Sequence, residues 1–300
     1  MKYKEIAALN RKKTYIVIGI YLMIYTFIGL LLDTVIYDKG TLIESLHSFI
    51  TLEVIPKATI GMFSIGAIMI YISIFFFRRI QLSGEDYIKI EEDNQEYKML
   101  INIMDELRIS ANMKYTPEIY VIDADYMNAF ASGWNEKNTM VAISRGLYES
   151  LNRDEIEAVM AHELTHIRNE DIKLTLIIGV ASNIMLFVVN NIVYFLNPKS
   201  DAGKYAKMML FALSFILPII TIILQMWMSR SREYMADAGS VELTRNPSSM
   251  RNALIKISGT EHEEANDTRN LAYIYSAKDS WFSKHPSIDS RLEAIGNLKI

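Results

Sequence analysis

The stretch Ala161-His162-Glu163-Leu164-Thr165-His166 places two histidines four residues apart, with a glutamate directly after the first. On a helix, positions i and i+4 share one face, with their Cβ atoms roughly 5–6 Å apart. Two imidazoles placed in this way can bind one Zn²⁺ at about 2.0–2.1 Å. Glu163 is rotated about 100° away from His162, so it lies beside the metal and can take a proton from a water molecule there. The pattern is typical of zinc hydrolases.

The residues around this motif predict the helix that the chemistry needs. Asn152, with Glu155 three residues later, forms an N-cap box. Apolar residues then recur at helical spacing: Ile156, Val159, Met160, Leu164 and Ile167. We therefore expect a helix from about Arg153 to Glu170.

The composition is apolar for a soluble enzyme. Hydrophobic residues make up 51% of the chain and charged residues 22%, and the mean hydropathy is positive. Cysteine is absent, so there are no disulfides or thiolate ligands, and metal ligands must come from His, Asp or Glu. The net charge of −4 gives no reason to expect nucleic-acid binding.

Four apolar runs carry no charged residue, and each is long enough to cross roughly 30 Å of hydrocarbon. They are Thr14–Leu32, Ala58–Phe77, Leu174–Leu196 and Met208–Met228. We expect four transmembrane helices in two hairpins. The alternatives are buried core helices of a soluble protein or, for the last two runs, a short or partly inserted hairpin.

Basic residues predict the orientation of these spans. Lys2, Lys4, Arg11, Lys12 and Lys13 precede the first run, and Arg78 and Arg79 close the second. The positive-inside rule then places the N-terminus and the segment after Ile80 in the cytosol. The loop Asn197–Lys207 carries three lysines and argues weakly against lying outside.

A catalytic zinc usually has a third protein ligand. His262 lies in an exposed acidic stretch and His47 is predicted to lie across the membrane, which leaves His285 or an acid on a second helix. Glu233 is the first acid after the fourth run, and Asp237 lies four residues later on the same helical face. Glu233 as ligand and Asp237 as hydrogen-bond partner of a ligand histidine is one hypothesis. A solvated helix face is the other.

Four segments in order resemble the HtpX-like membrane zinc metalloproteases, whose wider family includes the CAAX prenyl proteases. The segments are Asn128–Gly133, Ala161–Asp171, Ser231–Gly239 and Phe282–Pro286 with Arg291-Leu292. Together they lie between about Tyr97 and Leu298. Ser132 stands where the family often has threonine. The CAAX prenyl proteases have more apolar runs, so a prenylated peptide is not the expected substrate.

The resemblance implies a role for each matching residue. It implies one Zn²⁺ per chain with ligands His162, His166 and Glu233, and Asp237 as a partner of a ligand histidine. Glu163 would be the general base, and His285 would stabilise the oxyanion; alternatively, His285 only precedes a helix entered at Pro286. The strand that binds an extended substrate would contain Asn128, Ala129, Phe130, Ala131 and Ser132. The roles of Asp171, Arg291 and the Asn128 side chain stay open, with a structural ion pair as one possibility for Arg291.

The expected fold is α+β: a mainly helical, zincin-like metalloprotease domain with a small edge sheet, plus the four transmembrane helices. Residues 1–80 would form the first hairpin and 174–228 the second. Residues 81–173 and 229–300 would form the two parts of a cytosolic catalytic domain. Within these parts the patterns predict a loop at Gly84–Asp93, a helix at Tyr97–Ser110, and strands at Glu118–Ile122 and Thr139–Ser144 with Asn128–Gly133 between them. Further helices are expected at Ser231–Leu243, Pro247–Ser258 and Ile288–Leu298.

We expect an integral-membrane zinc endopeptidase of the cell membrane that cuts protein or peptide substrates. The resemblance implies quality control of misfolded membrane proteins. A regulatory membrane metalloprotease acting in signalling is the alternative, but the outer loops Asp33–Lys57 and Asn197–Lys207 are short for a ligand-binding domain. A scaffold with a structural zinc would usually supply four protein ligands, and three can be assembled here.

Overall fold

The computed structural model describes residues 3–298 apart from 39, 77–81, 83, 85, 135 and 260–285, and for 3, 174–176 and 224–231 it describes the backbone alone. The chain divides into two compact units. The helical unit comprises Lys12–Ser73 and Leu176–Leu224, and the sheet unit comprises Met1–Arg11, Ile74–Thr175 and Gln225–Ile300. His285 therefore lies outside the described residues.

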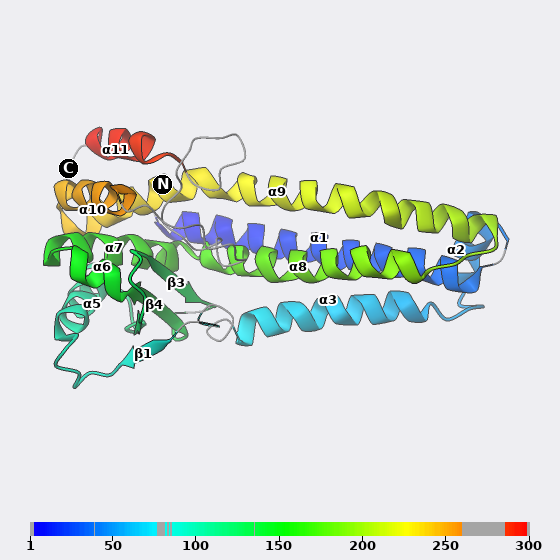
Figure 1. The fold of residues 1–300 in the computed structure, drawn as a ribbon, viewed down its shortest axis with the longest axis horizontal. Coiled ribbons are helices and arrows are strands. Elements are labelled where there is room, and N and C mark those ends of the chain that lie inside the picture. The colour runs from blue at the N-terminus through cyan, green and yellow to red at the C-terminus, as the bar shows by residue number, and fades with distance from the viewer. Residues whose placement is uncertain are drawn as a thin grey trace. The chain divides into compact units, whose positions relative to one another are not determined.

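The helical unit is built from the apolar runs. Its helices are α1 (Tyr3–Tyr37), α2 (Leu42–Ile50), α3 (Lys57–Phe75), α8 (Ile172–Phe195) and α9 (Asp201–Thr244), and all of them except α2 include residues of the sheet unit. Four stretches of the described chain are long and apolar enough to cross a membrane: Lys4–Tyr37, Lys57–Phe75, Ile177–Phe195 and Asp201–Ile223 (Figure 1). The four predicted transmembrane helices are thus confirmed as helices of spanning length.

Polar side chains join the helices inside this unit. The Tyr21 hydroxyl of α1 lies 2.5 Å from Ser182 Oγ of α8, and Thr221 of α9 donates to the same oxygen at 3.2 Å. At the other end of α1, Asp33 accepts from the Ala58 and Thr59 backbone N–H groups at 2.9 and 2.7 Å. These N–H groups begin α3 and have no partner within their own helix, so Asp33 caps α3.

The sheet unit contains a four-stranded mixed sheet in the order β1-β2-β4-β3. Its strands are β1 (Tyr87–Ile90), β2 (Glu118–Ile122), β3 (Ala129–Gly133) and β4 (Thr139–Ser144). β2 and β4 are parallel, while β1 pairs antiparallel with β2, and β3 pairs antiparallel with β4. β3 is therefore an edge strand of the described sheet.

Helices pack on the sheet and complete a single core. They are α5 (Lys98–Ser110), α6 (Arg145–Ser150), α7 (Arg153–Asn169), α10 (Pro247–Gly259) and α11 (Ile288–Gly296). α7 packs against β3, β4, α5 and α10, and the core contains apolar residues of all these elements. Residues of β3 and β4 that share one face, such as Ala131 and Val141, belong to this core.

α7 forms as its sequence predicts. The Asn152 side chain accepts from the Glu155 N–H at 3.0 Å, and the Glu155 carboxylate accepts from the Asn152 N–H at 2.9 Å. The helix ends at Glu170, whose φ of 54° is left-handed. The predicted strands and the helices at Tyr97–Ser110, Pro247–Ser258 and Ile288–Leu298 are confirmed to within one or two residues.

Three local features differ from expectation. The acidic Gly84–Asp93 is not all loop, since Tyr87–Ile90 pairs with β2. The loop between the first two spans contains the capped helix α2. The fourth run and Ser231–Leu243 belong to one continuous helix, α9, with Pro218 inside it. Buried and exposed residues do not alternate along β1, because its first three residues are exposed and only Ile90 is buried. A prediction based on such alternation therefore does not detect this strand.

Candidate metal site

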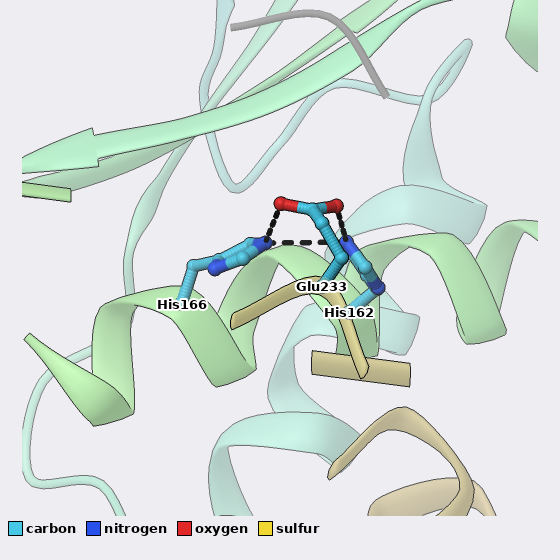
Figure 2. Close-up of side chains that lie close together, drawn as sticks. All are labelled: His162, His166 and Glu233. Carbon is cyan, nitrogen blue, oxygen red and sulfur yellow. Dashed lines mark hydrogen bonds and ion pairs between the residues drawn. The ribbon is translucent and has the colours of Figure 1, made fainter. Parts of the chain in front are cut away.

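Two helices of the sheet unit bring together His162, His166 and Glu233. The two histidines lie on α7 and the glutamate on the C-terminal part of α9. One donor atom from each lies within 4.8 Å of the others, and His162 and Glu233 are buried (Figure 2). The His162 and His166 Nε2 atoms are 3.2 Å apart, and Glu233 oxygens lie 3.7 Å from the first and 3.9 Å from the second. Of the three side chains, only that of His166 is partly exposed, at 13%.

A carboxylate lies beside the far nitrogen of each histidine. The His162 Nδ1 lies 3.0 Å from Asp237 Oδ1, and the His166 Nδ1 lies 3.1 Å from both oxygens of Asp171. A carboxylate at Nδ1 selects the tautomer that carries its proton there, so the Nε2 lone pair is left free. Both Nε2 lone pairs then face one another, which is stable only with a cation or a proton between them.

The distances fit a zinc ion. Four ligands at about 2.0–2.1 Å in a tetrahedron lie about 3.3 Å from one another. The two Nε2 atoms are 3.2 Å apart, close to that spacing, and a different Glu233 oxygen lies near each of them, at 3.7 and 3.9 Å. Two imidazoles and one carboxylate are a ligand set of catalytic zinc, which leaves a fourth position open. The residues present therefore fit the metal that the motif predicts.

Arg291 of α11 neutralises the carboxylates behind the site. Its side chain is fully buried, donates to both oxygens of Asp237 at 2.8 and 2.6 Å, and lies 3.8 Å from Glu233. Burial alone would raise the pKa of Asp237, but Arg291 outweighs it and the pKa is lowered. The open question about Arg291 thus has a structural answer, since it forms a buried ion pair.

Glu163 is buried beside the histidines on the next helical position. Burial raises the pKa of its carboxyl above the usual range, and His162, His166 and a hydrogen bond from the Ala131 N–H oppose the rise. Burial also acts to lower the pKa of His162, but Asp237 and Glu233 outweigh it and raise that pKa to about 9 in the metal-free protein.

The predicted substrate residues form or adjoin the edge strand. Asn128 is buried just before β3, and its N–H donates to Ser144 Oγ at 2.8 Å. Ala129, Phe130, Ala131 and Ser132 lie in β3. The Ser132 Oγ is buried and has no hydrogen-bond partner among the described residues.

Sequence reasoning left Asp171 without a role, although the structure places it against His166. Its position just after the predicted end of α7, five residues beyond His166, was the available signal. Glu170 adopts a left-handed conformation that turns the chain back toward the last helical turn. Glycine usually occupies such a position, so a glutamate there gave no sign of this turn.

Comparisons with known proteins identify the family of this chain. Residues 94–299 match the family described as Peptidase family M48. A protein named Protease HtpX homolog in Helicobacter acinonychis (strain Sheeba) is 41% identical, with 98% of each chain covered. A protein of the same name in Bacteroides fragilis (strain ATCC 25285) is 30% identical, with 92% of this chain and 89% of that protein covered.

The fold is shared with a solved structure. The crystal structure of S. mikatae Ste24p superimposes with a TM-score of 0.52 at 20% identity, covering 83% of this chain and 61% of that one. The sequence resemblance and the α+β fold with membrane helices are confirmed by these findings. On the family match, the near full-length relatives and the four apolar helices, the chain belongs to peptidase family M48 and is a multi-pass membrane metalloendopeptidase.

Proposed function

We propose that the chain is a zinc-dependent endopeptidase whose metal ligands are His162, His166 and Glu233. One observation carries the proposal: three donor atoms converge from two helices, and a buried carboxylate supports each histidine from behind. Bound there, zinc would act as a Lewis acid on the scissile carbonyl and lower the pKa of water to about 7. Side chains of the protein would carry out proton transfer and stabilise the oxyanion.

Glu163 is the proposed general base. Its carboxylate takes the proton of the attacking water and later releases it to the leaving amine nitrogen. The raised pKa of its buried carboxyl suits a group that must both accept and release a proton. The resemblance assigns His285 to the oxyanion of the tetrahedral intermediate, and we keep that assignment as part of the proposal.

The free edge of β3 is the proposed binding site for an extended substrate. The Ser144 N–H donates to the Asn128 carbonyl at 2.9 Å, so residues 128, 130 and 132 point their backbone groups toward β4. The backbone groups of Ala129 and Ala131 then point away from β4. The Ala131 N–H bonds to Glu163, which supports an edge that faces the proposed base. A substrate strand added there would have its peptide bond beside the metal site.

We further propose that the substrates are membrane proteins, cut on the cytosolic side in protein quality control. The four apolar helices support a substrate shared with the bilayer. The basic residues before the first span and after the second support a cytosolic site. The name Protease HtpX homolog of the relatives supports the peptidase but names no substrate.

The variant Glu163→Gln tests the mechanism in full-length protein purified in detergent. Zinc content, measured by atomic emission, should equal that of the wild type because Glu163 is not a ligand. Hydrolysis of fluorescently labelled casein should fall by a factor of at least about 10², within the range typical of general-base catalysis.

Glu157→Gln is the matched control, because Glu157 lies on the same helix and pairs with Arg153 at 3.1 Å. It should retain wild-type hydrolysis. Wild-type hydrolysis in Glu163→Gln would disprove the assignment of the base, and loss of zinc in the same variant would show that Glu163 is a ligand instead.

A further inference from the structure

The first residues of α1 lie against the turn that ends the metal-binding helix. Asn10 is 4% exposed, and its side-chain amide donates to the Asn169 carbonyl at 2.8 Å. The neighbouring Arg11 pairs with Glu170 at 2.9 Å. Residues 159 positions apart in the sequence thus meet within the sheet unit. These contacts involve the last residues of α7 and not its sequence motif.

The contacted turn places Asp171. Glu170 has a φ of 54°, and the Glu170 and Asp171 N–H groups donate to the Ile167 and His166 carbonyls. A residue other than glycine pays for a left-handed conformation and keeps it only where surrounding contacts require it. The turn brings both Asp171 oxygens to 3.1 Å from His166 Nδ1. A displaced turn would therefore misorient one of the proposed zinc ligands.

The Asn10 bond is the buried part of this contact. Asn169 is 2% exposed and Asp171 is 1% exposed, so a carbonyl that lost its donor there would not be rehydrated without local opening. Arg11 differs, since 54% of its side chain is exposed, and exposed ion pairs contribute little. Asn10 thus makes the contact to be tested, and the adjacent Arg11 serves as its control.

We propose that Asn10 is a positioning residue for the metal site, acting through the turn Asn169–Asp171 on the orientation of His166. The inference rests on the proposed zinc ligands. It makes the part of α1 before the apolar run Thr14–Leu32 a structural part of the peptidase site. Zinc affinity then depends on a residue that no metal-binding motif contains.

Zinc affinity of the full-length protein in detergent, measured by competition with a fluorescent chelator, tests the inference. Asn10→Leu keeps the approximate size and removes the donor. We expect it to weaken zinc binding roughly tenfold, the lower end of the 10–100-fold loss typical when a ligand's supporting partner is removed. Asn10→Asp should act in the same direction, and it serves if Asn10→Leu does not fold. Arg11→Gln should stay within about twofold of the wild type.

A double variant separates positioning from general loss of stability. If Asn10 acts through Asp171, then Asn10→Leu should not weaken zinc binding further once Asp171→Asn is present, whereas its effect on the melting temperature should persist. Equal zinc losses in both backgrounds would overturn the inference. A loss below threefold in both Asn10 variants would overturn it as well.

His166→Ala distinguishes failure of the inference from failure of the proposed function. If that variant keeps wild-type zinc affinity, the proposed ligand set is wrong. If it loses zinc while the Asn10 variants bind normally, the ligand set stands and only the role of Asn10 fails.

Discussion

The distance between α7 and α9 sets the geometry of the proposed metal site, and Gly239 of α9 lies directly against Thr165 of α7. A Cβ added at Gly239 would lie 2.3 Å from Thr165 Cγ2 and 2.5 Å from Thr165 Oγ1. Carbon atoms in contact prefer about 3.5–4.0 Å. Both branches of the Thr165 side chain, Cγ2 and Oγ1, would clash with the added Cβ. A change of the Thr165 rotamer would therefore still leave one branch in contact with it. We therefore expect Gly239→Ala to push the helices apart by about 1 Å.

The size of this shift predicts its effect. Zinc–ligand distances are held to within about 0.2 Å, so moving Glu233 on α9 by about 1 Å from the histidines on α7 should break the triangle of donors. Overpacking also costs about 1–3 kcal/mol of stability. A misplacement of about 1 Å can reduce the rate of an enzyme by about 10², and we expect a loss of that size in casein hydrolysis and weaker zinc binding.

Two further variants complete the experiment. Thr165→Ala in the Gly239→Ala background removes the two closest atoms, after which the nearest atom is the Cβ of residue 165 at 3.0 Å, so it should restore most of the activity. Gly61→Ala in α3 is the control, because a Cβ there meets nothing within 4 Å. If Gly239→Ala hydrolyses casein and binds zinc within threefold of the wild type, the reasoning about helix separation is refuted.

Three other results are expected. Arg291→Met leaves the buried Asp237 without its cation and should destabilise the protein by about 3–5 kcal/mol, visible as a lower melting temperature; Arg291→Lys should not rescue it, because lysine cannot make the bidentate pair. Asp33→Ala removes the cap of α3 and should cost about 1 kcal/mol, whereas Asp33→Asn, which still offers an oxygen acceptor, should cost less in the same thermal assay. Chelation of zinc should lower the melting temperature of the wild type by mass action but leave that of His162→Ala unchanged, and an equal drop in both would argue against the site.

Local patterns predicted much of the fold. The capping box at Asn152 and the apolar spacing after it predicted α7 because both signals act within a few residues. The apolar runs predicted the long helices for the same reason. The exposed strand β1 was not predicted, since it is stabilised by pairing with β2 and not by a buried face of its own. Pairing between distant segments leaves no mark on the periodicity of one of them.

The candidate site divides in the same way. The helical spacing of the two histidines predicted that they share one face and that Glu163 lies beside them, because backbone geometry alone determines which positions of a helix meet. The position of Glu233 after the fourth run and the spacing to Asp237 suggested these two acids, the resemblance supported them, and the structure brings Glu233 to the histidine nitrogens. No pattern in the sequence predicted the contacts that Asp171, Arg291 and Asn10 make around the site.

The sequence by itself determined a zinc-type motif on a capped helix, four helices of spanning length and the order in which they occur. Only the tertiary structure decided which groups surround the motif: the antiparallel contact of α7 with α9, the buried cation behind the carboxylates, and the amide of Asn10 on the turn. The physical reason is that helix formation depends on near neighbours, whereas the orientation of a ligand depends on buried partners from remote parts of the chain, chosen by packing.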